Sequence, residues 1–438
     1  MATSLGFDFG TTNTVVAQVQ DGGRAIPFEF AFDNQRIAAF RSALCFWADV
    51  VRHRSHIHAE AGPWAIQRFI EDPWDCRFMQ SIKSFAASHN FQGTAIHGKR
   101  RSYEELLGVF FERLRFHAGG RLEALPARLV VGRPVTYVGS EPDAQLAMRR
   151  YQDALAPFGF QEIRDVYEPV AAAFYYAQRL TRSATVLVAD FGGGTTDYSV
   201  MRFDLAGGAI AAHALGHAGV GVAGDNFDYR IIDHVVSPRL GKGTRYDSMG
   251  KTLEIPGHYY SSFARWNLLS VMKTSKEFRD IKRLVQVSER PDLLERFVEL
   301  IEHDHGYPLY KAVSEAKERL SSAEETEFHF AAGDFQISTR IKRADFEAWI
   351  ADDLARIAAS LDDALRNASV RAGEIDKVFL TGGTSFVPAV RRLFEQRFPA
   401  DRIESGDELL SIANGLALIG EQEDIEDWTI PLERGTGT

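Results

Sequence analysis

Two segments of the chain repeat one pattern, and this repeat restricts the fold more than any other feature. Residues 5–16 read LGFDFGTTNTVV, and residues 186–200 read VLVADFGGGTTDYSV. In each segment an apolar run leads into Asp-Phe-Gly, then into Gly and Thr residues typical of a tight turn, and then into a second β-prone run. The repeat predicts two similar β-hairpins on two related lobes, each presenting a polar tip to one shared cleft.

Helical and strand-like patterns alternate between the two hairpins. Residues Tyr103–His117 have the apolar spacing of an amphipathic helix, and residues 127–131 read as a buried strand. A helix over 143–156 and a short strand over 163–166 follow. Alternation of this kind at these lengths predicts an α/β architecture in which helices cover the sheets.

The part of the chain after the second hairpin is less regular. A helix is predicted over 226–236, and residues 237–311 then read as an insertion that is Gly-rich at first and later helical and charged. Further helices are predicted over 313–321 and 344–368. Residues 378–383 again combine a strand with a glycine turn, so this half also follows α/β patterning.

Composition and charge exclude several classes of protein. The net charge of −10 argues against non-specific binding to nucleic acid or to an anionic membrane surface. The sequence contains no apolar run of about 18 residues and no secretory leader pattern at its start. Its two cysteines, Cys45 and Cys76, form no CxxC motif, which argues against a disulfide framework or a structural zinc site. We therefore expect a cytoplasmic protein with neither nucleic-acid nor membrane partners.

The residues at the two hairpin tips fit a polyphosphate ligand such as that of ATP. Backbone N–H groups can approach phosphate oxygens closely where side chains are small, and threonine hydroxyls add further donors. Asp8 precedes the first tip and Asp190 the second, in positions to hold Mg²⁺ mainly through its water molecules. Either tip alone would equally fit an ordinary Asp-Gly hairpin turn, whereas the pair favours nucleotide binding. The tip residues are Gly10, Thr11, Thr12 and Asn13 in the first hairpin, and Gly192, Gly193, Gly194, Thr195 and Thr196 in the second.

A third glycine-rich turn runs from Gly219 to Gly224 and formally matches the GxGxxG fingerprint of dinucleotide-binding proteins. It follows no clean apolar strand and lacks an acidic residue about twenty positions later to bind a ribose. Gly224 and Asp225 stand at the start of a predicted helix, so a phosphate or ribose contact is favoured over dinucleotide binding. Asp-Phe-Gly triplets also occur in protein kinases, but the chain lacks the HRD and VAIK motifs that accompany them there.

Taken in order, these segments resemble the nucleotide-binding domain of the DnaK-type heat-shock chaperones, and within that family the YegD-like members that lack a peptide-binding domain. FDFGTTNT and ADFGGGTTD resemble the family's two phosphate loops, YEPVAAAFYYA its connecting segment and GVAGDNFDYRIIDH its third glycine turn. SEAKERLSS and VFLTGGTSFVPAVRRLF resemble the two adenosine segments, and SGDELLSIANGLALIG resembles the last helix. The likeness extends over nearly the whole chain.

The resemblance implies the actin-like ATPase fold, of ribonuclease-H-like topology, with two lobes around a nucleotide cleft. It also implies that ATP or ADP and Mg²⁺ are the ligands, and that the protein is a slow ATPase acting as a conformational switch. An unidentified protein client or exchange factor would be its partner. The first lobe is then expected at residues 1–180, the second at 181–405 with the insertion 237–311, a helix returning to the first lobe at 406–420, and a frayed acidic tail at 421–438.

The resemblance also implies roles for individual residues that match the family's motifs. Lys83 matches the catalytic lysine that orients the attacking water and offsets charge at the terminal phosphate. Glu168 matches an acid that either polarises this water or holds a water in the second shell of the metal. Asp8, Asp190 and Asp197 would position Mg²⁺ and water. The remaining implied contacts are Thr11 and Thr195 with the phosphates, and Gly224, Lys317, Ser321, Gly382 and Gly383 with the adenosine.

Three positions on the adenosine side depart from the family's pattern. Ser314 stands where a glutamate is common, Glu318 follows the matching lysine, and Phe386 stands where an arginine is usual. The sequence therefore predicts that the adenine rests against Phe386. Two other functions stay open, namely an actin-like nucleotide-dependent scaffold or filament protein, and a small-molecule kinase of the same superfold. Phosphate release without an acceptor would separate an ATPase from a kinase, and sedimentation with ATP would reveal filaments.

Overall fold

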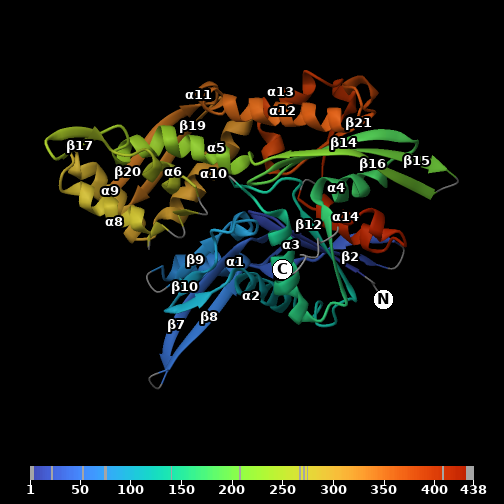
Figure 1. Ribbon diagram of the computed structural model, residues 1–438, viewed down its shortest axis with the longest axis horizontal. Coiled ribbons are helices and arrows are strands. Elements are labelled where there is room, and N and C mark those ends of the chain that lie inside the picture. The colour runs from blue at the N-terminus through green and yellow to red at the C-terminus, as the bar shows by residue number, and fades with distance from the viewer. Residues whose placement is uncertain are drawn as a thin grey trace, which may run out of the picture.

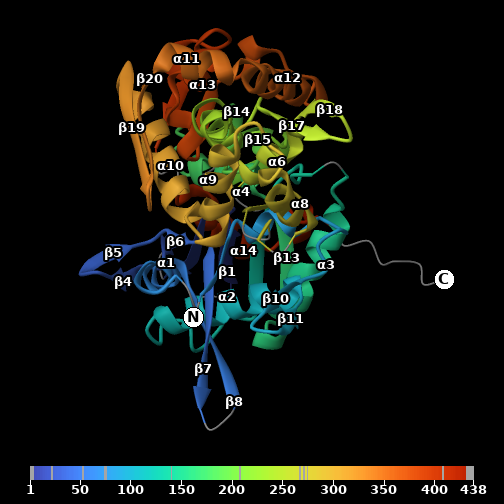
Figure 2. The ribbon, with the colours of Figure 1, turned by 90° about the vertical axis from the view of Figure 1, so that its left-hand side faces the viewer.

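Figure 1 shows the computed structural model of the chain, in which two sheets form the centres of two lobes. The structure describes residues 4–20, 23–51, 54–73, 76–139, 141–206, 209–265, 268–269, 272–273, 275–406 and 409–430. Turned by 90°, the second lobe lies above the first (Figure 2). Helices cover both sheets, as the alternating sequence pattern predicts.

The first sheet is built around the first of the two repeated hairpins. β1 (Ser4–Phe9) pairs antiparallel with β2 (Asn13–Gln20) and parallel with β12 (Arg128–Arg133), so the hairpin tip lies at residues 10–12. β1 is buried along its whole length because helices cover both faces of the sheet. The sheet is completed by β13 (Glu162–Tyr167), β3 (Arg24–Pro27) and β6 (Phe40–Arg41), in the order β13-β12-β1-β2-β3 with β6 also beside β2.

The second sheet repeats the connectivity of the first. β14 (Ala184–Phe191) pairs antiparallel with β15 (Thr196–Ala206) and parallel with β21 (Lys377–Thr381). β1 has the same pair of neighbours, one antiparallel and one parallel, which confirms that the repeated sequence pattern marks two related halves. The remaining strands are β16 (Ala209–Val220) and β22 (Ile403–Ser405), in the order β16-β15-β14-β21-β22.

Two short helices rich in small residues, α4 (Glu168–Ala177) and α14 (Ser411–Gly420), lie between the two sheets (Figure 1). The helices approach closely because a Cβ on Gly415 would lie 1.7 Å from the carbonyl oxygen of Ala171. One apolar cluster joins both helices to β12 and β13 of the first sheet and to β14 and β21 of the second. Any change in the angle between the lobes must therefore move these two helices.

The outer face of the first sheet is covered by α2 (Tyr103–His117) and α3 (Ala144–Leu155). α2 begins at a capping box, in which the Ser102 hydroxyl accepts from the Glu105 backbone and the Glu105 carboxylate accepts from the Ser102 backbone. The apolar residues on one side of this helix are all buried in the first-lobe core, namely Leu106, Leu107, Phe110, Phe111 and Leu114. The predicted bounds of α2 and the observed ones agree.

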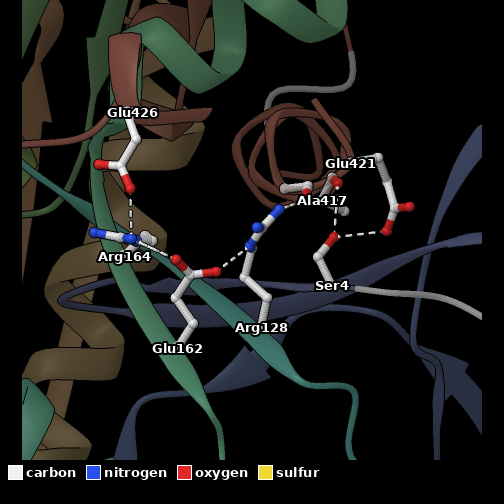
Figure 3. A network of polar contacts seen from close by, with 8 residues as sticks. Ser4, Arg128, Glu162, Arg164, Ala417, Glu421 and Glu426 are labelled. Carbon is white, nitrogen blue, oxygen red and sulfur yellow. Dashed lines mark hydrogen bonds and ion pairs between the residues drawn. The ribbon is translucent and has the colours of Figure 1, made fainter. Parts of the chain in front are cut away.

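The segment after α14 is held against the first lobe by a polar network (Figure 3). Arg128 donates to Glu162 at 2.5 Å and to the carbonyl oxygen of Gly420 at 2.6 Å. Arg164 pairs with both Glu162 and Glu426. The prediction of a frayed tail is therefore wrong for residues 421–430, where Ile425 is also buried; residues 431–438 lie outside the described part of the chain.

The remaining elements complete the two lobes, and the long hairpin of β7 (Ala43–Val51) and β8 (Arg54–Ala61) projects downward from the first lobe (Figure 2). The single helix predicted over 344–368 is broken at Ile350 into α11 (Arg343–Trp349) and α12 (Ala351–Asn367). The helix predicted over 313–321 starts earlier than expected, because α10 extends over Gly306–Ser322.

No helix among the described residues is long and apolar enough to cross a membrane. The first lobe adds β4 (Phe30–Phe32), β5 (Gln35–Ile37), β7 (Ala43–Val51), β8 (Arg54–Ala61), α1 (Gly62–Glu71), β9 (Arg77–Gln80), η1 (Ile82–Phe85), β10 (Thr94–Ile96) and β11 (Lys99–Arg101). The second adds α5 (Gly224–Ile231), β17 (Arg245–Ser248), β18 (Lys251–Glu254), α6 (His258–Phe263), α8 (Lys276–Val285), α9 (Pro291–Glu302), α10 (Gly306–Ser322), β19 (Glu325–Ala332), β20 (Phe335–Lys342), α11 (Arg343–Trp349), α12 (Ala351–Asn367), η6 (Gly383–Phe386) and α13 (Pro388–Glu395).

Candidate functional site

A cleft of about 230 Å³ lies between the two lobes, and both hairpin tips line it. The first lobe contributes the β1–β2 tip, η1 and the start of α4, whereas the second contributes the β14–β15 tip, α5, α10 and η6. The structure thus brings together residues that are far apart in the sequence. The predicted site residues in its lining are Asp8, Gly10, Thr11, Thr12, Asn13, Lys83, Glu168, Asp190, Gly192, Gly193, Thr195, Gly224, Asp225, Lys317, Gly382 and Gly383.

The two hairpin tips touch each other at the cleft, and glycine makes this contact feasible. A Cβ on Gly193 would lie 2.8 Å from the Thr12 hydroxyl oxygen and 3.1 Å from a carboxylate oxygen of Asp225. Gly382 has a φ of +82°, and a Cβ there would lie 2.0 Å from the carbonyl oxygen of Phe191. A side chain at either position would push the walls of the cleft apart. Glycine at the tips therefore allows the backbone to come close to a ligand.

A buried ion pair joins Lys83 of η1 to Glu168 at the first residue of α4. Both side chains are less than a tenth exposed. Burial alone would lower the pKa of Lys83, but the carboxylates of Glu168 and Asp8 outweigh it and raise the pKa. Lys83 is therefore a fixed positive charge facing the acidic residues of the cleft.

Buried carboxyl groups outnumber this lysine at the end of the cleft predicted to bind phosphate. Burial, followed by the charge of Glu168, raises the pKa of Asp8 to about 7 and that of Asp197 to about 7. The same causes raise the pKa of Asp190 well above its usual range. Four carboxyl groups beside one lysine repel one another when ionised, so the raised pKa values favour protonation, and a bound cation would stabilise the ionised forms.

The donor set at this end fits Mg²⁺ held largely through water. Mg²⁺ is usually bound by one or two carboxylates together with phosphate oxygens and water molecules. Within the described residues, no group of three or more His, Cys, Asp and Glu side chains is arranged to ligate a metal directly. One carboxylate oxygen of buried Asp197 also has no hydrogen-bond partner among these residues. Asp8 and Asp190, which line the cleft, are the residues that would face such an ion.

Three predicted residues of the second hairpin lie behind the cleft wall and do not line it. The Thr196 hydroxyl donates to the carbonyl oxygen of Val222 at 2.7 Å, so it fixes the neighbouring glycine turn. Asp197 accepts from the backbone N–H groups of residues 135 and 136 at 2.8 and 3.2 Å. A Cβ on Gly194 would lie 2.9 Å from the Val138 side chain. These residues therefore support the tip from within the protein.

The end of the cleft predicted to bind adenosine is organised around a second buried ion pair. The Lys317 ammonium lies 2.8 Å from the Asp228 carboxylate and donates to the carbonyl oxygen of Gly224 at 3.2 Å. Burial, followed by the charge of Asp228, raises the pKa of Asp225 to about 6. Ser321 does not line the cleft, because its hydroxyl bonds one turn back to the carbonyl oxygen of Lys317. Lys317 is therefore engaged by the protein itself.

The position of Phe386 bears on the predicted adenine stack. Its side chain is 58% exposed, and it is absent from the residues that line the cleft. Phe386 ends the short turn η6, in which the Gly382 and Gly383 backbone faces the cleft while the following Val387 is buried. Phe386 is therefore not among the side chains that line the cleft, and the adenine stack on Phe386 stays a prediction.

Sequence reasoning missed four residues of the lining that carry polar groups: Arg41, Asp228, Tyr310 and Thr384. Asp228 lies three residues after Asp225 on α5, and this spacing on one helix face could have drawn attention to it. Tyr310 lies on the part of α10 that precedes the predicted helix. No local signal marks Arg41, because its place depends on the pairing of β6 with β2.

Comparison with known families agrees with this geometry. A family model described as "Hsp70 protein" matches residues 80–249 and 304–423, more than half of the chain. The chain belongs to the Hsp70 family. The predicted DnaK-type family and the actin-like ATPase fold are thus confirmed, and the chain is placed among ATP-binding proteins of this chaperone family.

Individual relatives in the Hsp70 family are longer than this chain. The chaperone protein DnaK of Deinococcus radiodurans is 25% identical over 438 aligned residues, which cover 95% of this chain and 59% of the relative. DnaK of Thermus thermophilus is 24% identical over 438 residues, covering 97% of this chain and 62% of the relative. The chain thus spans about three fifths of the length of these curated relatives. The finer prediction of a YegD-like subtype stays a prediction.

Proposed function

We propose that this Hsp70-family chain binds Mg²⁺-ATP in the interlobe cleft and hydrolyses it slowly, as a conformational switch. The observation that carries the proposal is the meeting of two glycine-threonine hairpin tips, one from each lobe, beside buried Asp8, Asp190 and the Lys83–Glu168 pair. A ligand that contacts both tips at once binds the closed arrangement of the lobes better than the open one. Such differential binding is what drives closure.

The phosphate chain is bound by the backbone and hydroxyl groups of the tips. Thr11 and Thr195 line the cleft from opposite lobes and supply hydroxyl donors. Asp8 and Asp190 would hold Mg²⁺ through its water molecules, and the ion would supply charge neutralisation at the phosphates. Asp197 acts indirectly, because its bonds to residues 135 and 136 hold the second tip in place.

Lys83 and Glu168 prepare the attacking water for hydrolysis. The Lys83 ammonium is fixed beside the Glu168 carboxylate, and both side chains line the cleft. Glu168 accepts a proton of the water and orients its lone pair, while Lys83 stabilises negative charge that develops on the terminal phosphate. A lysine held by an ion pair costs little reorganisation during the reaction.

The switch acts on a partner protein in this proposal. Two relatives are named chaperone protein DnaK, and the chain matches about three fifths of their length. A protein client or an exchange factor would then sense the lobe angle, which α4 and α14 transmit between the sheets. The proposed lobe boundaries remain residues 1–180 and 181–405, with helix 406–420 returning to the first lobe, and the proposed location is the cytoplasm.

Single-turnover hydrolysis tests the proposal. Purified protein is mixed with substoichiometric ATP and Mg²⁺ without an acceptor, and ADP and phosphate are quantified. We expect hydrolysis by the wild type and a loss of at least about 100-fold in Lys83→Ala, with ATP still bound. Lys99→Ala, at an exposed lysine on β11, is the matched control and should hydrolyse normally. Binding without hydrolysis by the wild type would contradict the ATPase and favour the scaffold or the kinase.

A further inference from the structure

Three cationic side chains line the cleft in the described part of the chain: Lys83, Lys317 and Arg41. Lys83 is paired with Glu168, and Lys317 is paired with Asp228. Arg41 makes no ion pair with any described residue, and its single hydrogen bond runs from Nη1 to the Asn13 side-chain oxygen at 3.2 Å. The guanidinium is half-buried, so its charge is only partly solvated. A partly buried cation that has no carboxylate partner would be stabilised by an anionic ligand.

Arg41 is held on a rigid part of the first lobe, beside the first hairpin tip. Its strand β6 pairs with β2 so that Arg41 lies opposite Asn13. The preceding Phe40 is fully buried and packs on other aromatic rings of the core. The following Ser42 donates its backbone N–H to the carbonyl oxygen of Thr12 at 2.9 Å. The backbone on both sides of Arg41 is thus fixed relative to the tip.

The Arg41 side chain faces the second lobe across the cleft. It lies close enough to Asp225 of α5 to lower the pKa of that carboxyl, against the larger effects of burial and Asp228. It also lines, together with Tyr310 of α10, a neighbouring groove that shares these two residues with the cleft. Arg41 therefore stands where the first tip, the second lobe and the neighbouring groove meet.

We propose that Arg41 binds the phosphate chain of the nucleotide and makes the cleft select phosphorylated nucleotides over nucleosides. The inference rests on the proposed nucleotide function and assigns a residue that the sequence patterns did not reveal. A guanidinium offers several N–H donors in a planar fork that matches phosphate oxygens. The other two cations are already engaged by carboxylates, so Arg41 is the one whose donors are free for a ligand among those described.

A competing account is that Arg41 serves only to hold the two lobes together through Asp225 and Tyr310. In that case its loss would weaken every ligand that needs a closed cleft, whether or not the ligand carries phosphate. A phosphate-binding residue instead contributes nothing to adenosine. The two accounts therefore differ in the dependence of the effect on the phosphate chain.

The test measures the affinities of ATP and adenosine by calorimetry with Mg²⁺, in wild type, Arg41→Ala and Arg41→Gln. We expect both variants to bind ATP about 10- to 100-fold more weakly and adenosine within about twofold of the wild type. Arg41→Gln keeps a side-chain donor for Asn13, so it controls for loss of the local hydrogen bond. Arg36→Ala, at a largely exposed arginine on β5, should leave both affinities unchanged.

Two results would overturn the role of Arg41. Equal losses for ATP and adenosine would show that it acts as a contact between lobes, and an unchanged ATP affinity would show that it does not touch the phosphates. Thermal unfolding of each variant confirms that the fold is intact. Failure of the wild type to bind ATP would overturn the proposed function itself, and with it this inference, whereas the first two results leave the proposed function standing.

Discussion

The phosphate end and the adenosine end of the cleft are built in different ways. At the phosphate end the residues come from two hairpin tips with related sequences, and the cleft lining contains Asp8, Asp190 and most of the tips' glycines and threonines. At the adenosine end Lys317 is engaged by Asp228, Ser321 bonds within its own helix, and Phe386 lies outside the lining. In the proposed function, phosphate recognition would thus follow from local turn chemistry, whereas nucleoside recognition would depend on how distant helices pack.

The two buried lysines show the same contrast. Lys83 is surrounded by an excess of carboxyl groups, whose ionised forms a bound cation would stabilise. Lys317 and Asp228 largely neutralise each other, and Lys317 also bonds to the Gly224 backbone. We infer that the first ion pair acts on the ligand and the second on the structure of the cleft.

The largest expected effect concerns the second ion pair. Lys317→Met leaves the buried Asp228 carboxylate without its partner, which should cost about 3–5 kcal/mol of unfolding free energy. Denaturation in urea measures this loss. Lys317→Met combined with Asp228→Leu should recover much of it, and Lys311→Met, at an exposed lysine on the same helix, should be neutral. Full stability in Lys317→Met would refute a structural role for the pair.

The next effect concerns the metal at the phosphate end. Asp190→Asn removes a carboxylate charge while nearly keeping the side-chain shape, so the affinity for Mg²⁺-ATP should fall about 10- to 100-fold. Metal-free ATP should be affected less, and titrations with and without Mg²⁺ measure the difference. Asp204→Asn, at a half-exposed carboxylate on β15, is the matched control. Equal losses with and without the metal would count against Asp190 as a metal-facing residue.

The raised pKa values predict a pH dependence of stability. Asp8 and Asp197 have folded-state pKa values of about 7, above the ordinary value of 3.8, so the folded state binds more protons between these limits. The unfolding free energy of the nucleotide-free protein should therefore fall as pH rises from 5 to 8. Each kcal/mol of unfolding free energy lost should lower the unfolding temperature by about 2–4 °C. Bound Mg²⁺-ATP should reduce the fall. Asp165, outside the cleft lining, also has a pKa of about 7, and a slope abolished by Asp165→Asn alone would show that the cleft acids are not its source.

The smallest effect is expected at Phe386. Because the ring does not line the cleft, Phe386→Ala should change the ATP affinity by less than about twofold, a difference below the contribution of an aromatic stack. Gly383→Leu is a positive control, since a Cβ there meets no atom within 4 Å and its side chain would enter the cleft lining. A large loss of affinity in Phe386→Ala would support the adenine stack and remove the contrast between the two ends.

Much of the fold could be predicted because its signals are local. The repeated hairpins, the apolar spacing of α2 and the glycine turn before α5 are each written in consecutive residues. The docking of residues 421–430 could not be predicted, because it depends on Arg128 and Arg164 of distant strands. The course of the insertion, with α10 beginning at Gly306, also lacked a local signal.

The same distinction between local and distant signals applies to the candidate site. The tips could be predicted from the Gly and Thr residues that follow an Asp-Phe pair, and most of these residues line the cleft. Arg41 and the Lys317–Asp228 pair could not be read, since each joins elements that meet only in the folded chain. The exposure of Phe386 could not be read either, because a sequence shows that a ring follows a turn but not toward which side the ring points.

Competition by fragments of ATP tests the central claim most directly. Inorganic tripolyphosphate and adenosine are each titrated, in the presence of Mg²⁺, against protein carrying a fluorescent ATP analogue. If the two hairpin tips carry recognition, tripolyphosphate should displace the analogue at concentrations at which adenosine does not. Displacement by adenosine but not by tripolyphosphate would contradict the account, because the adenosine end would then be the one that holds the ligand.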